Sequence, residues 1–81
     1  MKQLLLILDT PDFPGWKRDF DAEAAERMEA GLTLLQMWRE AGTQSRVLLL
    51  FEYNHRPRAE AWLAKEQGFG GPMTAHFLET A

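Results

Sequence analysis

Apolar and polar residues along the first part of the chain predict a strand and then a helix. Residues 4–8 form a continuous apolar run flanked by charge, which is typical of a central strand buried on both faces. After two prolines, apolar side chains recur at a spacing of four residues, at Trp16, Phe20, Ala24 and Met28. This spacing predicts one amphipathic helix of about four turns, with its apolar stripe against a sheet. Gly31 is the expected left-handed residue that ends it.

The middle of the chain predicts a β-hairpin. Two apolar runs, 32–39 and 46–53, flank a short polar segment that contains Gly42, a typical hairpin signature. If Glu40 faces Arg46 across the turn, alternation places on one face Thr33, Leu35, Met37, Arg39, Val47, Leu49, Phe51 and Tyr53. The other face then carries Leu32, Leu34, Gln36, Trp38, Leu48, Leu50 and Glu52. Both faces are largely apolar, so we expect helices to cover one and a partner chain or a ligand to cover the other.

The last third of the chain completes an α+β domain. A second helix follows Asn54 and ends at Gly68, and a glycine-rich connection at 68–72 leads to a last strand at 73–79. The order strand, helix, strand, strand, helix, strand predicts a ferredoxin-like βαββαβ fold. Its four-stranded antiparallel sheet carries both helices on one face and leaves the other face bare. The first and third strands are expected in the middle of the sheet, because they are the most continuously apolar.

Size and composition favour self-association. The 81 residues make one domain, 1–81, and a chain this short buries only about 60% of its unfolded surface. Cysteine is absent, which excludes disulfides and thiolate metal sites, and two histidines far apart in the sequence do not predict a metal site. With a hydrophobic fraction of 46%, we expect a homodimer whose two sheets pair face to face.

The net charge and the lengths of the apolar segments exclude nucleic acid and membranes as predicted partners. The net charge is −3 and the isoelectric point about 5.3, which does not favour nucleic acid. The predicted open face shows leucines and Glu52, without the basic residues and paired aromatics of an RNA-binding sheet. No stretch approaches the ~18 consecutive apolar residues that span a membrane. The apolar start is short and lacks a small-residue cleavage site, so we predict a buried strand, no signal peptide and a cytoplasmic protein.

Two titratable residues are candidates for catalysis on the open sheet face. Alternation places His76 on the opposite face from Phe77, where its imidazole can act as a general base in the space between two sheets. Glu52 shares its face with Gln36 and Trp38, and a carboxylate in a semi-enclosed apolar space can exchange protons. Structural explanations stay open: His76 at a sheet edge or dimer seam, and Glu52 as a carboxylate at a strand end.

Gln36 and Trp38 are candidates for ligand binding. An indole wall with one neighbouring amide suits a flat, partly polar ligand. A tryptophan at this position also serves as an anchor between two subunits. The sequence therefore allows a ligand site or a packed dimer contact at these two residues.

A set of short motifs runs along nearly the whole chain. The motifs are Asp12-Phe13, Trp16-Lys17, Phe20-Asp21-Ala22, Ala30-Gly31, Val47 to Glu52, Trp62-Leu63, Gly71-Pro72 and Phe77-Leu78-Glu79. Together they resemble small antibiotic-biosynthesis-monooxygenase-like proteins of the dimeric α+β barrel superfamily. The resemblance implies a homodimer whose sheets enclose a barrel-like space, with cofactor-independent monooxygenases and muconolactone isomerase-like enzymes among its relatives. One departure is Glu23-Ala24-Ala25, where the subfamily often has His-Ala-Pro, and it argues against identical chemistry.

Two functional hypotheses follow. The first is a small-molecule-binding homodimer of the monooxygenase-like group, either a cofactor-independent oxygenase or an isomerase or cyclase acting on an aromatic or polyketide-like substrate. In this hypothesis Glu52 and His76 exchange protons, Gln36 and Trp38 orient the ligand, and neither a cofactor nor a metal takes part. The second is a non-catalytic ligand carrier or interaction module, in which leucines fill the space between the sheets.

Overall fold

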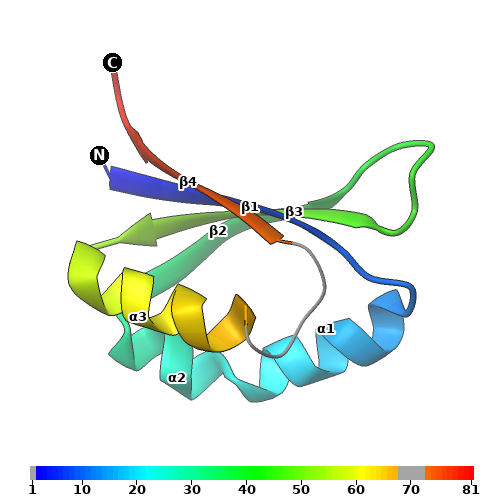
Figure 1. The fold of residues 1–81 in the computed structure, drawn as a ribbon, viewed down its shortest axis with the longest axis horizontal. Helices are drawn as coiled ribbons and strands as arrows, with labels where there is room; N and C mark the ends of the chain where they lie inside the picture. Colours follow the sequence, from blue (N-terminus) through cyan, green and yellow to red (C-terminus); the bar gives the residue numbers. More distant parts are fainter. Residues whose placement is uncertain (1, 68–72) are drawn as a thin grey trace.

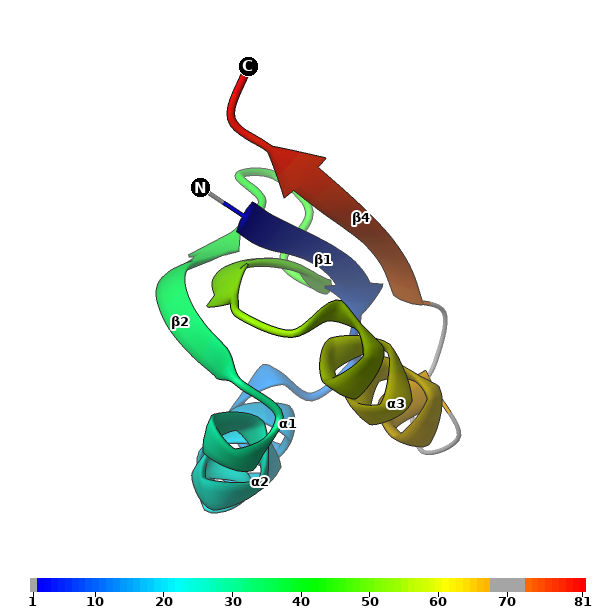
Figure 2. The same ribbon diagram turned by 90° about the vertical axis from the view of Figure 1, so that its left-hand side faces the viewer.

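The chain forms a sheet covered on one side by helices. A computed structural model describes residues 2–67 and 73–81, and the predicted connection at 68–72 lies outside them. The elements are β1 (Lys2–Asp9), α1 (Phe13–Ala22), α2 (Ala24–Glu29), β2 (Leu32–Arg39), β3 (Arg46–Tyr53), α3 (Arg56–Gln67) and β4 (Met73–Glu79). The four strands form one antiparallel sheet in the order β2-β3-β1-β4. All the described helices lie on one side of it (Figure 1), as the perpendicular view also shows (Figure 2). This confirms an α+β, roughly ferredoxin-like architecture.

The hydrophobic core lies between the sheet and the helices. β1 and β3 are the two middle strands, as predicted, and every second side chain of each is buried on the helical side. Phe51 is at the centre of this core, with its ring centroid 6.3 Å from that of Phe20 and edge-on at 5.8 Å to that of Trp62. The alternate side chains of the middle strands are half-buried on the open face. The continuous apolar runs thus supply a core on one face and an apolar surface on the other.

The predicted four-turn helix is two shorter helices, so the prediction of one helix is wrong. The break lies at Glu23 (φ −96°, ψ 14°). Nearby, the buried Arg27 donates to the carbonyl oxygen of Phe20 and lies over its ring at 3.6 Å from the centroid. A spacing of four residues also drifts by about 40° per step around a helix of 3.6 residues per turn. Met28 therefore leaves the apolar stripe and is 77% exposed, while Gly31, with φ of 75°, follows α2 as predicted.

The predicted faces of β2 hold only in its second half. The predicted register there is confirmed by the pairs Gln36–Leu50, Met37–Leu49 and Trp38–Leu48. A bulge between Leu34 and Gln36 shifts the register in the first half, where the pairs are Leu32–Tyr53, Thr33–Glu52 and Leu34–Phe51. Because side chains alternate with a period of two, one extra residue moves the preceding side chains to the opposite face. Leu32 and Leu34 therefore lie on the helical side, contrary to the prediction, and Leu32 is buried.

The described helices are all too short or too polar to cross a lipid bilayer. The longest, α3, has twelve residues, whereas a spanning helix needs about 20 apolar residues.

Candidate functional site

The four residues named from the sequence all lie on the open face of the sheet. Gln36 and Trp38 come from the edge strand β2, Glu52 from the middle strand β3 and His76 from the opposite edge strand β4. Trp38 is 44% exposed, and His76 and Gln36 are also exposed, whereas Glu52 is half-buried. Their predicted face is therefore correct for all four.

The sheet brings only some of these side chains together. Gln36 pairs with Leu50, so it lies diagonally across from Glu52 at a Cα separation of roughly 8 Å. His76 is two strands away from Glu52, because Leu5 of β1 lies between it and β3. Strand spacings of ~4.8 Å and rises of ~3.3 Å per residue place the Cα atoms of His76 and Glu52 roughly 12 Å apart. Within one chain, Glu52 and His76 therefore do not form a pair.

A cavity that is half open to solvent lies on the other side of the sheet, among α1, α3 and the middle strands. Its volume is about 1000 Å³. The apolar part of its wall consists of Leu6, Leu8, Trp16, Phe20, Leu49, Trp62 and Met73. The polar part includes Asp9, Thr10, Asp12, Arg18, Asp19, Glu23, Ser45 and Glu66. Apolar and aromatic walls with a few convergent polar groups are typical of small-molecule sites.

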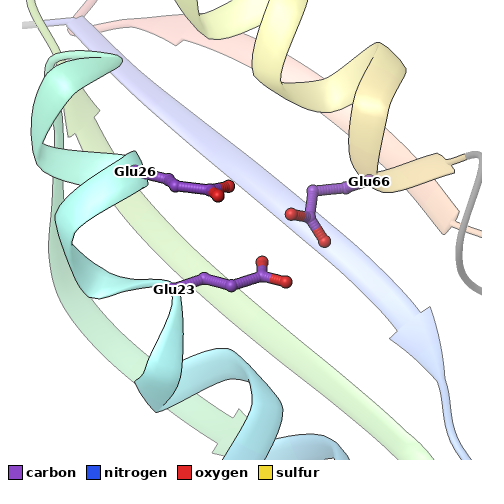
Figure 3. Close-up of side chains that lie close together, drawn as sticks. All are labelled: Glu23, Glu26 and Glu66. Carbon is purple, nitrogen blue, oxygen red and sulfur yellow. The ribbon is translucent and has the colours of Figure 1, made fainter.

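Three carboxyl groups meet at one end of this cavity. One carboxylate oxygen from each of Glu23, Glu26 and Glu66 lies within 4.8 Å of the other two. Figure 3 shows Glu23 and Glu26 reaching from the α1–α2 break and α2 toward Glu66 on α3. Glu26 is paired with Lys65 at 2.7 Å, whereas Glu23 and Glu66 line the cavity. The break between α1 and α2 positions Glu23, and the last turns of α3 position Glu66.

One of the two cavity-lining carboxyl groups, that of Glu66, has a raised pKa. Burial, the hydrogen bond with Glu23 and the negative charges of Glu23 and Glu26 together raise the pKa of Glu66 from 4.5 to about 7, with Lys65 opposing them. Two carboxyl groups this close cannot both ionise freely. The carboxyl group of Glu66 can therefore donate or accept a proton near neutral pH, the property that general acid–base chemistry requires.

Two cations hold the helices beside this pair. Burial lowers the pKa of Arg27, while the negative charges of Glu23, Asp21 and Glu66 oppose that shift. Lys65 crosses from α3 to Glu26, and this hydrogen bond raises the pKa of Lys65. Each cation has an acceptor of its own, the carbonyl oxygen of Phe20 for Arg27 and the carboxylate of Glu26 for Lys65.

Sequence reasoning did not identify the cavity residues. Glu23 was noted as a departure from the monooxygenase-like pattern and assigned to no site. Trp62 was predicted as a core residue on the apolar stripe of the second helix, and its burial confirms this. A signal was nevertheless present, because Glu66 follows Trp62 by four residues and Glu23 follows Phe20 by three. Residues at these spacings are neighbours on a helix surface. A carboxylate beside a buried aromatic side chain on each of two helices thus indicates a polar group at the edge of the core.

We expect the carboxyl pair to make stability depend on pH. The pKa of Glu66 is higher in the folded chain than its ordinary value, so its contribution is fully present below about pH 4.5 and is lost as the pH rises through about 7. After discounting for partial exposure, the free energy of unfolding should fall by on the order of 1 kcal/mol over this range. Urea denaturation at several pH values measures this change.

The matched variants are Glu66→Gln and Glu60→Gln. The first should remove the loss of stability between about pH 4.5 and 7, and the second, on the exposed part of α3 where Glu60 pairs with Arg56, should retain it. A carbon-13 titration that places the pKa of Glu66 below 5 would contradict this expectation.

Comparisons with protein-family models, with curated proteins and with solved structures found no match for this chain. The resemblance to monooxygenase-like proteins therefore stays a prediction, and the argument for a function rests on the geometry of the chain.

Proposed function

We propose that this protein is a homodimer that binds a small, largely apolar molecule in the cavity between the helices and the sheet of each chain. The observation that carries this proposal is the cavity itself, with a volume of about 1000 Å³ and aromatic and aliphatic walls. Small-molecule sites occupy about 300–1000 Å³. The Glu23–Glu66 pair adds a proton donor and acceptor at its edge, which an isomerisation or cyclisation requires. A cofactor-independent enzyme of that kind is the catalytic form of the proposal.

The open sheet face supports the homodimer. Its centre consists of half-buried apolar side chains, Leu5 and Ile7 from β1 and Leu48 and Leu50 from β3. Four strands of about eight residues cover roughly 26 by 19 Å, or about 500 Å² in projection. Side-chain relief increases the accessible area, so two such faces approach the ~1,200–1,600 Å² of a stable interface. A second copy is the occupant whose apolar centre matches this face by symmetry.

The arrangement of the four residues on the open face favours a filled contact between the two sheets. The central apolar rows are Leu5 and Ile7 on β1 and Leu48 and Leu50 on β3. They separate His76 on β4 from Gln36 on β2, and Glu52 lies at the end of these rows. In the proposed dimer the central rows meet their symmetry mates, and Trp38 anchors the edge. This is the basis of the second candidate function, a non-catalytic ligand carrier or interaction module with a filled inter-sheet core.

Native mass spectrometry of the freshly purified protein tests the proposal. The expected result is a dimer of 9.3 kDa chains with a discrete adduct that is lost on denaturation. Ala22 lines the cavity, so Ala22→Phe should reduce the adduct, whereas Ala64→Phe on the exposed face of α3 should not. A bare dimer favours the interaction module, and a monomer contradicts the proposal.

A further inference from the structure

The open face of the sheet carries opposite charges at the two ends of a middle strand. At one end of β3, the guanidinium group of Arg46 lies 3.7 Å from Asp9 on β1 and 3.3 Å from Glu40. At the other end lies the half-buried carboxylate of Glu52, and Leu48 and Leu50 lie between the two ends on the same face. The strand therefore presents a cation, two leucines and an anion in that order.

The carboxylate of Glu52 lacks a compensating cation in its own chain. Its side chain forms no ion pair and no hydrogen bond with the part of the chain that the structure describes, and its neighbours across the sheet are Thr33 and Gln3. Arg46 has spare donors, because Glu40 accepts only one hydrogen bond from its guanidinium group. Pairing of the open face with a second copy buries Glu52 further, so a stable dimer needs a cation opposite this carboxylate.

The register of the sheet decides which residues meet when two copies pair. Successive rows across the two middle strands are Asp9–Arg46, Ile7–Leu48, Leu5–Leu50 and Gln3–Glu52. A two-fold axis that runs across the strands, between the row of Leu48 and the row of Leu50, reverses the order of the rows in the second copy. Leu48 then faces the partner's Leu50, and Arg46 faces the partner's Glu52.

We propose that the homodimer is built on this axis and is held in register by reciprocal ion pairs between Arg46 of one copy and Glu52 of the other. Facing sheets pack about 10 Å apart, a gap that the long side chains of an arginine and a glutamate span together. Aligned sheets cross at about 30°, which displaces the strand ends by about one strand spacing, within reach of a guanidinium group. This inference rests on the proposed function, because it names the contacts of the proposed dimer.

The edge strand β2 fits the same axis. Gln36 and Trp38 lie in the rows of Leu50 and Leu48, so the axis places Gln36 opposite Trp38 of the partner subunit. The side-chain nitrogen of Gln36 donates to the carbonyl oxygen of Met37 at 3.2 Å, which leaves the side-chain oxygen to accept from the indole N–H. The two residues predicted to bind a ligand thus form a contact between subunits in this arrangement.

A two-fold axis that runs along the strands gives a poorer match of charges. It places Arg46 opposite the partner's Asp9, a residue that Arg46 already contacts within its own chain, and Glu52 opposite the partner's Gln3. The carboxylate of Glu52 then stays without a cation in a closed interface, which is unfavourable. The pattern of charges therefore favours the axis across the strands.

Charge-swapped chains test the pairing. Arg46→Glu and Glu52→Arg each bring like charges together in their homodimers, so each should raise the Kd of the dimer at least ~10-fold. Mixing the two variants restores the ion pairs, and native mass spectrometry should show roughly tenfold more heterodimer than either homodimer. As the control, Arg58→Glu mixed with Glu60→Arg, both on the exposed face of α3, should pair at random.

Neutral variants measure the same contact without like charges at the strand ends. Arg46→Gln and Glu52→Gln should each raise the Kd of the dimer by roughly fivefold, with circular dichroism as the check on folding. The double variant should raise the Kd no further, because both substitutions remove the same ion pair. Additive effects of the two substitutions overturn the pair.

Each contrary outcome has a defined meaning. Random pairing of Arg46→Glu with Glu52→Arg, in a protein that remains dimeric, overturns the ion pair and leaves the proposed dimer standing. Preferential pairing of Arg46→Glu with Asp9→Arg assigns the axis along the strands and also overturns the inference. A monomeric unaltered protein contradicts both this inference and the proposed function.

Discussion

Replacing Leu50 with glutamate should leave one chain folded and weaken the proposed sheet-to-sheet dimer. Leu50 lies at the centre of the open sheet face, between Gln36 on β2 and Leu5 on β1, and is half-buried in the single chain. A carboxylate there can reach water in a monomer. In a sheet-to-sheet dimer it would meet its symmetry mate in an apolar contact, where like charges repel and desolvation is unfavourable. We expect the dissociation constant of the dimer to rise at least ~100-fold, which corresponds to about 3 kcal/mol.

Sedimentation equilibrium of the variant measures this effect, and circular dichroism reports whether the fold is retained. Ala64→Glu introduces the same charge on the exposed face of α3 and should leave the dissociation constant unchanged. Equal dissociation constants for Leu50→Glu and the unaltered protein would exclude the open face as the dimer interface.

Replacing Phe51 with alanine should cause the largest loss of stability. Phe51 is fully buried, and its ring contacts those of Phe20 on α1 and Trp62 on α3. The substitution removes the side chain that joins both helical segments to the middle of the sheet, and it leaves a cavity. Such changes cost about 3–5 kcal/mol, a large part of the roughly 5–15 kcal/mol that stabilises a typical domain.

Urea denaturation followed by circular dichroism quantifies this loss. Leu35→Ala on the edge strand, where Leu35 is 42% exposed, should cost less than ~1 kcal/mol. A similar loss in both variants would mean that Phe51 does not have the central packing role that its contacts indicate.

Leu50 and Phe51 both lie on β3, one of the two middle strands. These strands are the part of the fold that the sequence predicts best. The apolar runs 4–8 and 46–53 correctly indicate β1 and β3 in the centre of an antiparallel sheet. Such runs are informative because a strand buried on one face and half-buried on the other leaves few positions for polar residues. The order of elements and the placement of the helices on one face follow from the same pattern.

The two errors of fold have local causes that periodicity does not encode. The bulge before Gln36 reverses the faces of Leu32 and Leu34, and the break at Glu23 divides the first helix. The break lies beside the contact of Arg27 with Phe20, which are seven residues apart in the chain. A pattern of apolar positions contains no information about such contacts.

The candidate sites also divide into features that the sequence predicts and features that it does not. Alternation along the strands was sufficient to place Gln36, Trp38, Glu52 and His76 on one face. It was not sufficient to show which of them are neighbours, because that depends on the order of strands across the sheet. β1 lies between the strands of His76 and Glu52 and so sets the distance between these two residues. Its position there depends on the order of the strands across the sheet.

By itself, the sequence determined the four strands, their order along the chain, the central strands and an apolar sheet face without helices. These properties depend on the chemistry of each residue and its near neighbours along the chain. Only the tertiary structure decided that Glu23 and Glu66, 43 residues apart in the numbering, meet at the edge of a cavity. The pKa of Glu66 depends on burial and on charges from other elements, and those quantities exist only after the helices have packed against the sheet.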